Sequence, residues 1–353
     1  MDNVYMLNHL KSLSSKIWVA IAQIDELKGQ WIGGAQLSPQ VLGRLKRSVL
    51  ITSTGASTRI EGAKLSDEQI EKMMKGIVVQ KFADRDKQEV QGYYELLQNV
   101  FDSWRHIRFS EGTIKHFHKE LLKYVEKDTL HRGEYKKREN KVQMIDNEGK
   151  AVETLFDTTP AYLTGKQMLE LCETTVTALQ KKDIHPLVII GNFIVEFLLI
   201  HPFQDGNGRL SRIITNLLLL QAGYGFMPYV SHEKLIEDRK PQYYIALRRT
   251  QKTLRTKRPD VIPWFEFFLS VILEQANSAV ELLSKEKVEK LLSPKQLAVW
   301  EYMRKVKEAT PKEIAQKTGV ARPTINQVLD KLMKFKKVER IGLGRTTRYR
   351  RIS

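Results

Sequence analysis

Two strongly apolar runs, residues 187–200 and 210–220, enclose a short polar stretch, and this arrangement constrains the fold more than any other feature of the chain. The first run is typical of a buried helix. In the second run, leucine and isoleucine recur with the spacing of an amphipathic helix. Polar and flexible residues are costly at the centre of an apolar region unless they have a task there. We therefore expect function between the two helices.

The intervening residues 201–212 read His-Pro-Phe-Gln-Asp-Gly-Asn-Gly-Arg-Leu-Ser-Arg, and their types suit the binding of phosphate groups. Gly206 and Gly208 would let the unpaired N–H groups at the start of the second helix face an anion. Arg209 and Arg212 are three positions apart, so they share a side of that helix. From there they could present two guanidinium groups to phosphates.

Two further side chains complete a set suited to phosphoryl or nucleotidyl transfer. Asp205 is a hard oxygen donor of the kind that Mg²⁺ takes when phosphates supply its other ligands. His201 could take a proton from an attacking hydroxyl group at neutral pH. The simpler interpretation is an Asp-Gly-Asn-Gly turn beside a packed histidine, but the whole constellation is much more specific than such a turn.

The stretch resembles the signature of the Fic family, His-x-Phe-x-(Asp/Glu)-Gly-Asn-Gly-Arg-x-x-Arg, and fills every specified position. The resemblance implies a mainly α fold with a helical core and, usually, the transfer of AMP from ATP to a hydroxyl group of a protein. By position, His201 would be the general base, Asp205 the ligand of Mg²⁺, and Phe203 a packing residue that fixes the loop.

The same resemblance assigns contacts with ATP. Asn207 and the backbone of Gly206 and Gly208 would hold the α- and β-phosphates. Arg209 would hold the β- and γ-phosphates. Arg212 would contact the γ-phosphate or a regulatory carboxylate.

An upstream stretch, Ser57-x-x-x-Glu61-Gly62, resembles the inhibitory motif of Fic proteins, (Ser/Thr)-x-x-x-Glu-(Gly/Asn). In that family the glutamate comes from a helix beside the active site and pairs with the second signature arginine, here Arg212. A carboxylate at that point would repel the nucleotide tail. The resemblance thus implies an autoinhibited enzyme whose inhibitory helix precedes the core, and a plain solvent-facing glutamate is the alternative.

Two segments that flank the signature carry further predictions. Residues 142–145 and 152–156 are β-like runs around a Gly-containing turn, which predicts a hairpin. It lies where the family carries its flap, here about residues 140–157, which aligns the target by strand addition; an ordinary surface hairpin is the alternative. After the signature, a tyrosine often lies against the adenine in the family. Tyr243 and Tyr244 are candidates, although aromatic packing in the core explains them equally well.

Breaks in the helical pattern divide the chain into four parts. We expect a helical region over residues 1–89, which begins with a helix over about 4–30 and contains the inhibitory motif. The Fic core follows over 90–274, then a helical connector over 275–292. The last part, 293–353, is a separate domain.

This last part resembles a winged helix-turn-helix domain. Two short helical patterns surround the turn at Gly319, and two strand patterns with glycines between them follow as a basic wing. The start of the third helix would expose side chains that hydrogen-bond base edges or phosphates, namely Arg322, Thr324, Asn326 and Gln327. Further phosphate contacts would come from Lys334, Lys336, Lys337, Arg345 and Arg348.

The charge of this end of the chain favours a polyanion as partner. Residues 291–353 hold 16 Lys and Arg against 5 Asp and Glu, a net charge of +11 out of +17 for the whole chain. A basic surplus concentrated in one domain favours DNA. Winged helices also serve as protein-binding or dimerising modules, so a homodimer is the alternative.

Composition bounds the remaining classes. The single cysteine, Cys172, cannot form an internal disulfide and lacks the partners of a catalytic thiol, so we interpret it as a core residue. The N-terminal residues lack the layout of a signal peptide. The run over 187–200 is too short for a membrane span and is interrupted by Asn192 and Glu196. We expect a cytoplasmic protein without a membrane partner.

The leading interpretation is therefore a protein adenylyltransferase that uses Mg²⁺ and ATP and modifies a Ser, Thr or Tyr of a protein, which could be the enzyme itself. The same enzyme acting in reverse, as a deAMPylase, and another nucleotide donor both stay open. The alternative from another class is a DNA-binding transcriptional regulator that uses the Fic core as a nucleotide sensor.

Overall fold

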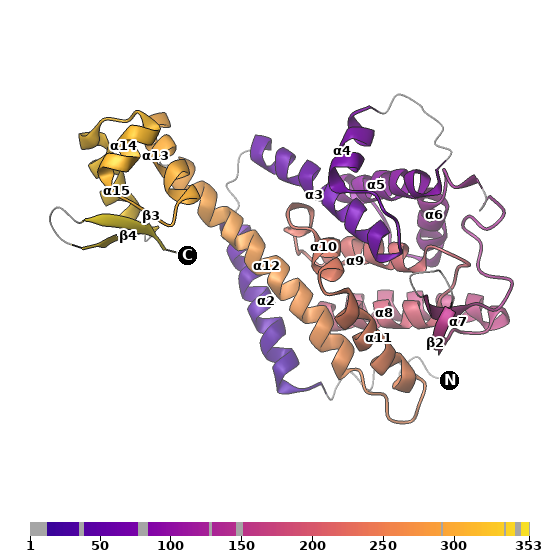
Figure 1. Cartoon of the computed structure of the whole chain (residues 1–353). Coiled ribbons are helices and arrows are strands. Elements are labelled where there is room, and N and C mark those ends of the chain that lie inside the picture. Colours follow the sequence, from indigo (N-terminus) through magenta and orange to yellow (C-terminus); the bar gives the residue numbers. More distant parts are fainter. Residues whose placement is uncertain are drawn as a thin grey trace. The chain divides into compact units, whose positions relative to one another are not determined.

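The structure is a computed structural model, and Figure 1 shows the course of the chain. The chain divides into two compact units, Met1–Val280 and Glu281–Ser353, and helix α12 (Ile262–Lys290) runs from the first into the second. The described residues are 13–34, 39–76, 84–126, 129–145, 151–290, 292–334, 337–342 and 347–352, with side chains except in 141–145, 151–157 and 284–290. Some predictions lie outside these ranges: the helix start over 4–12, the hairpin turn, Lys336 and Arg345.

The first unit is mainly helical, as the sequence predicts. The helical region over 1–89 and the core that follows it belong to this same unit. In chain order its further helices are α2 (Ser15–Gly34), α3 (Pro39–Ile60), α4 (Asp67–Lys75), α5 (Arg85–Ser103), α6 (Glu111–Leu121), α7 (Ala161–Lys181), α8 (Pro186–Ile200), α9 (Asn207–Gln221), the 3₁₀-helix η3 (Met227–Tyr229), α10 (His232–Glu237) and α11 (Lys240–Leu254).

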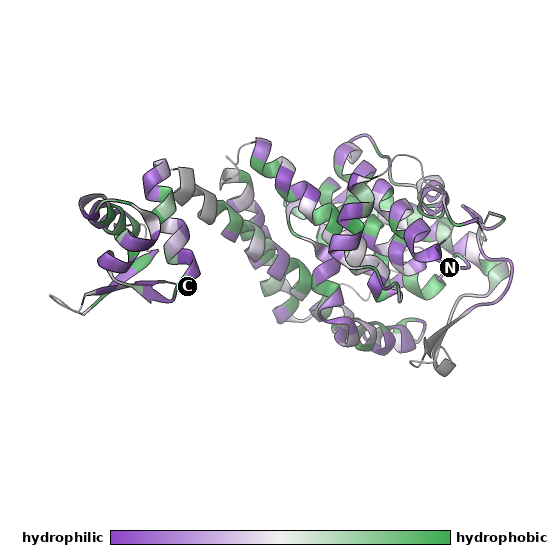
Figure 2. Cartoon of the chain, turned by 45° about the horizontal axis from the view of Figure 1, so that its top comes forward, coloured by the Kyte–Doolittle hydropathy of each residue, from purple (hydrophilic) through white to green (hydrophobic). Residues whose placement is uncertain are grey.

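Helices α8 and α9 form the centre of this unit, and both were predicted from the apolar runs. Every residue of α8 after Pro186 is buried. Helices α7, α9 and α11 pack against α8, and α3, α5 and α6 pack against α9. Hydrophobic residues gather between these helices, and hydrophilic residues dominate the outer faces (Figure 2). Among the described residues no helix combines the length and hydropathy that a bilayer crossing requires.

The predicted hairpin is present in the first unit. Strands β1 (Lys141–Ile145) and β2 (Ala151–Asp157) pair antiparallel, with Lys141 opposite Asp157 at its base. The register shifts twice along the pair, between Val142 and Gln143 and between Met144 and Ile145. Strand β2 lies beside α11.

The second unit contains three helices and a small sheet with their own core. Helices α13 (Pro294–Lys305), α14 (Pro311–Thr318) and α15 (Arg322–Lys334) surround apolar residues that include Trp300, Ile325 and Leu329. The sheet has the order β3-β5-β4 and is antiparallel. Its strands are β3 (Glu308–Ala309), β4 (Val338–Ile341) and β5 (Arg348–Arg351). The sequence predicted β4 and β5 but not β3, because two residues are too few to show a strand pattern.

We predict that Gly92→Ala destabilises the first unit by about 3 kcal/mol, the upper range for overpacking. A Cβ atom built on Gly92 in α5 would lie 2.1 Å from the carbonyl oxygen of Leu121, so a backbone would have to move. Gly29→Ala in α2 is the matched control, since nothing lies within 4 Å of its Cβ position. The control should be neutral or stabilise by about 0.5–1 kcal/mol. Chemical denaturation followed by circular dichroism measures both, and equal effects would contradict this account of the α5–α6 contact.

Candidate active site

The chain turns sharply between α8 and α9, and its residue types explain how. His201 ends α8 with φ 51°, and Gly206 precedes α9 with φ 81°, which glycine adopts without strain. The Asn207 side chain braces the turn: it accepts a hydrogen bond from the Phe203 N–H at 2.9 Å and donates one to the Phe203 carbonyl at 2.8 Å. Since the amide is used here, a phosphate contact of Asn207 would fall to its main-chain N–H.

His118 of α6 supports the same turn through two of its residues. Its ring stacks on Phe203 with 3.8 Å between ring centroids. Its Nδ1 accepts a hydrogen bond from the Gly133 N–H at 2.9 Å, so the proton lies on Nε2, which donates to the Asp205 carbonyl at 3.0 Å. Burial lowers the pKa of His118 to about 4, which keeps the ring neutral. The sequence does not indicate this role, because the partners of His118 lie 15 and 87 positions away.

His201 lies at the end of α8 and is partly exposed. Burial lowers its pKa to about 4, and the nearby charge of Lys136 acts in the same direction. The Lys136 ammonium donates to the Ile200 carbonyl at 3.1 Å and to the hydroxyl of Thr158 at 2.7 Å. At neutral pH the His201 imidazole is therefore unprotonated and can accept a proton.

Asp205 and Arg209 belong to a ring of four charged side chains completed by Arg85 and Glu89 of α5. The Oδ2 atom of Asp205 lies 2.8 Å from Nη2 of Arg209 and 2.9 Å from Nη2 of Arg85. The two carboxylate oxygens of Glu89 lie 2.6 Å from Arg209 and 2.7 Å from Arg85. Burial alone would raise the pKa of Asp205, but Arg209, the Gly206 N–H and Arg85 outweigh it and lower that pKa.

Arg212 is buried in α9, with 2% of its side chain exposed. Its Nε donates to the Ser57 hydroxyl at 2.8 Å, and its Nη2 donates to the Ser57 carbonyl at 3.0 Å and to Glu61 Oε1 at 2.7 Å. Its Nη1 has no hydrogen-bond partner within the described part of the chain. A Cβ atom built on Gly208 would lie 2.2 Å from Oε1 of Glu61. Two segments 151 positions apart therefore meet over the start of α9.

The end of α3 explains how Glu61 reaches this place. The N–H of Ala63 donates to the Thr58 carbonyl and the N–H of Gly62 to the Arg59 carbonyl, both at 3.1 Å. This is the Schellman pattern, which requires the left-handed region at Gly62, where φ is 105°. Glu61 is thus the capping residue of α3, and its side chain leaves the helix just where the chain reverses.

Arg59 fixes this helix end to its neighbours. Its guanidinium forms a two-pronged ion pair with Glu237 of α10, at 2.6 and 3.1 Å. The remaining nitrogen donates to Asp67 at 2.9 Å and to the Leu65 carbonyl at 3.0 Å. The chain is therefore held on both sides of Glu61.

Comparison with known proteins identifies the family of one part of the chain. The sequence profile of the Fic/DOC family matches residues 108–219, which include the turn between α8 and α9. The chain contains a Fic family domain.

Solved structures and curated sequences extend the likeness. A Fic family protein from Desulfovibrio desulfuricans G20 is similar over 97% of both chains, at 25% identity and a TM-score of 0.60. A Fic domain containing signaling protein from Bacteroides thetaiotaomicron shares the fold over 74% of this chain and 97% of its own, at 20% identity and a TM-score of 0.60. The protein adenylyltransferase Fic of Drosophila mojavensis is 35% identical over 81 residues, 23% of this chain and 15% of that protein.

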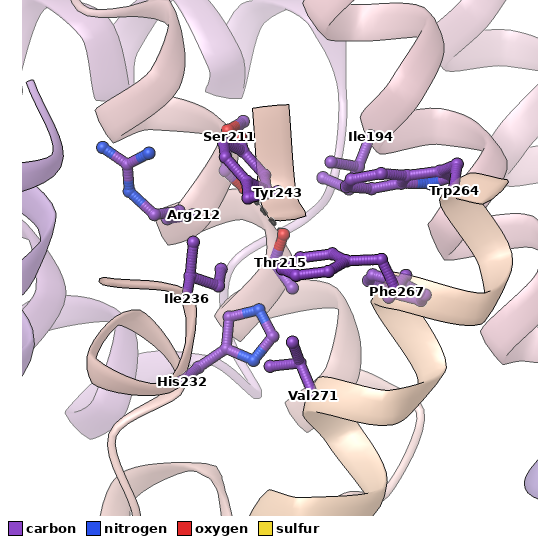
Figure 3. Close-up of a pocket in the computed structure, with 11 residues that line it drawn as sticks. Ile194, Ser211, Arg212, Thr215, His232, Ile236, Tyr243, Trp264, Phe267 and Val271 are labelled. Atoms are coloured by element: carbon purple, nitrogen blue, oxygen red, sulfur yellow. Dashed lines mark hydrogen bonds between the residues drawn. The ribbon is translucent and has the colours of Figure 1, made fainter. Parts of the chain in front are cut away.

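The two tyrosines after the signature differ in their surroundings. Tyr243 is buried against Trp264 and Phe267, with ring centroids 6.2 and 5.7 Å away (Figure 3). The cavity between these rings is also lined by Arg212. Its free volume is about 10 Å³, enough for about one water molecule and far too little for an adenine ring. In this conformation Tyr243 is a core residue. Tyr244 is partly exposed, and its contact with adenine stays a prediction.

The residues of the Fic domain fit Mg²⁺ only together with further ligands. Within the described residues no group of three His, Cys, Asp or Glu side chains could hold a metal ion. Asp205 offers one carboxylate, with 39% of its side chain exposed, and Mg²⁺ is usually bound by one or two carboxylates plus substrate phosphates. Such phosphates suit the first N–H groups of α9 and the Nη1 of Arg212, which has no hydrogen-bond partner among the residues that the structure describes.

In the second unit the predicted DNA contacts lie in the first two turns of α15. Arg322, Asn326 and Gln327 are exposed and Thr324 is partly exposed, whereas Ile325 between them packs into the core. The sheet beside them is less basic than its sequence indicates. Glu308 lies 3.1 Å from Arg348 and 3.7 Å from Arg350 and so offsets part of their charge.

We predict that His118→Phe lowers the free energy of unfolding by about 2 kcal/mol, because it leaves the Gly133 N–H and the Asp205 carbonyl unpaired. The aromatic stack on Phe203 would remain. His116→Phe is the control, since His116 is exposed on the same helix and should change stability by less than about 0.5 kcal/mol. Urea denaturation compares the two, and an equally small effect would show that the hydrogen bonds of His118 contribute nothing.

Proposed function

We propose that the protein is an adenylyltransferase that transfers AMP from ATP to a Ser, Thr or Tyr hydroxyl of a protein, and that Glu61 holds it inactive. The observation that carries this proposal is the contact of Glu61 with Arg212 above the start of α9, beside His201. Curated relatives that match part of the chain are named protein adenylyltransferase Fic, which supports the reaction class.

The proposed chemistry follows from the site. The target hydroxyl attacks the α-phosphorus of ATP in line, and its proton passes to the neutral His201. The new phosphate ester forms as the bond to pyrophosphate breaks. Arg209, Arg212 and the first N–H groups of α9 stabilise the negative charge that moves onto the leaving group. Asp205 and the phosphates would together hold Mg²⁺, which neutralises further charge.

The hairpin would present the target to His201. Two tethers at its base favour this role: Asn140 donates to the Phe203 carbonyl at 3.0 Å, and Thr158 donates to the Asn140 carbonyl at 2.8 Å. A target segment that adds to the edge of this hairpin would gain main-chain hydrogen bonds. Because the end of the hairpin is bound to the turn between α8 and α9, such a segment would lie at a defined distance from His201.

Inhibition follows from charge. Near Arg212 the Glu61 carboxylate is a negative group where the γ-phosphate would bind, and two like charges in a partly buried site repel each other strongly. ATP can therefore bind productively only after this carboxylate leaves. The same site could run in reverse and remove AMP, since the forward and reverse reactions use the same groups.

We predict that Glu61→Gly and Glu61→Gln each raise labelling by α-labelled ATP roughly tenfold. Each variant removes the repulsion between the Glu61 carboxylate and the γ-phosphate, which we expect to exceed about 1.4 kcal/mol. His201→Ala should abolish labelling. Glu71→Gln, which removes a carboxylate exposed on α4, is the control and should leave labelling unchanged. Mass spectrometry of Glu61→Gly protein with Mg²⁺ and ATP identifies the added AMP and the modified residue. Equal labelling of wild type and the Glu61 variants would reject the inhibitory role, and no labelling in any variant would reject the enzyme.

A second candidate function is DNA binding by the second unit, with the Fic domain as a nucleotide sensor. It is favoured by the exposed polar row of Arg322, Asn326 and Gln327 on α15 and by the +11 charge of this end of the chain. Side chains of these types read base edges and phosphates. The two functions are compatible in one protein.

Arg322→Ala should weaken binding of the full chain to random-sequence duplex DNA about tenfold, as expected for a lost base or phosphate contact. Lys295→Ala is the control, because it removes one exposed positive charge from α13 instead. Fluorescence anisotropy at several salt concentrations measures both. Equal losses in the two variants, or binding that does not depend on salt, would contradict the assignment of α15.

A further inference from the structure

Two charged residues of the first unit occupy helix ends that disfavour their charge. Glu61 caps the C-terminal end of α3, and Arg85 is the first residue of α5. The helix dipole makes an anion unfavourable at a C-terminus and a cation unfavourable at an N-terminus. The dipole of its own helix stabilises neither charge, and both side chains contact the signature, Glu61 at Arg212 and Arg85 at Asp205.

One oxygen of the Asp205 carboxylate, Oδ2, is fully engaged in this arrangement. The Oδ1 atom accepts the Gly206 N–H at 2.6 Å, and the Oδ2 atom accepts from both Arg209 and Arg85. A cation that binds the Oδ2 atom must therefore replace one of the two arginines. Three carboxylates and three guanidinium groups meet here, so their formal charges cancel: Asp205, Glu89, Glu61, Arg85, Arg209 and Arg212.

Of the two arginines on Asp205, Arg85 is the one that can leave. Arg209 has 2% of its side chain exposed and is held by Glu89 within the protein. Arg85 also contacts Glu89, at 2.7 Å, but 49% of its side chain is exposed, so its guanidinium can leave Asp205 for water while the contact with Glu89 remains. Its departure leaves Arg209 in place for the phosphates.

We propose that Arg85 holds the place of Mg²⁺ at Asp205 in the resting protein, as Glu61 holds the place of a nucleotide phosphate at Arg212. This inference rests on the proposed nucleotide site. Entry of Mg²⁺ with ATP then exchanges one cation and one anion of the protein for those of the substrate. Arg85 thereby sets how much Mg²⁺ the site requires.

The test measures ATP binding by calorimetry, with His201→Ala and Glu61→Gly in every protein to prevent turnover and open the site. The quantity compared is the ratio of the ATP dissociation constants without and with Mg²⁺. Arg85→Ala should raise this ratio about two- to fivefold, the range for loss of an exposed ion pair. Arg85→Lys keeps the charge and should raise it less. Lys87→Ala removes a charge from the same turn of α5 and should leave the ratio unchanged.

Each other outcome counts against the exchange. If Arg85 contacts the nucleotide instead, Arg85→Ala weakens ATP binding equally with and without Mg²⁺, and the ratio stays constant. If Lys87→Ala changes the ratio as much as Arg85→Ala does, the effect comes from the net charge of the site and not from the contact of Arg85 with Asp205. If the parent protein binds no ATP with or without Mg²⁺, the proposed function fails and the exchange fails with it. If the parent protein binds ATP but Arg85→Ala leaves the ratio unchanged, only the exchange is rejected.

Discussion

A guanidinium group buried in the first unit, that of Arg212, requires a counter-charge, and much of the site is arranged to supply it. Leaving a buried charge unpaired costs several kcal/mol. In the described structure Ser57 and Glu61 satisfy two of its nitrogens, and they reach it because α3 packs against α9. The third nitrogen, Nη1, has no hydrogen-bond partner in the described part of the chain. The resting site is thus stable but incompletely satisfied, which leaves a ligand something to gain.

The turn between α8 and α9 is held from three directions, and this explains how polar residues survive there. Asn207 ties the turn to itself, His118 supports it from α6, and the Lys136 ammonium binds the last carbonyl of α8. Each contact satisfies a backbone or ring atom that burial would otherwise leave unpaired. The N–H groups at the start of α9 are consequently presented by a fixed backbone, and fixed donors cost little to reorganise when charge develops.

The sequence predicts those parts of this arrangement that depend on local pattern. The apolar runs predict α8 and α9, and the β-like runs around a Gly-containing turn predict the hairpin. The sequence did not predict the residues that act through tertiary contacts. Glu89 and Arg85 reach the signature only because α5 packs on α9. Their own surroundings in the sequence are those of an ordinary charged helix start, and nothing in that pattern indicates a partner 120 positions away.

The clamp of Arg59 on both sides of Glu61 has a kinetic consequence. Unwinding the last turn of α3 would break the contacts of Arg59 with Glu237, Asp67 and the Leu65 carbonyl together. Rotation of the Glu61 side chain breaks none of them, and 32% of that side chain already faces solvent. Exposed side chains change rotamer within nanoseconds. Under the proposed inhibition, the open fraction is therefore set by the free energy of the Glu61–Arg212 ion pair and not by the unfolding of a helix end, and the resting enzyme retains the activity of that fraction.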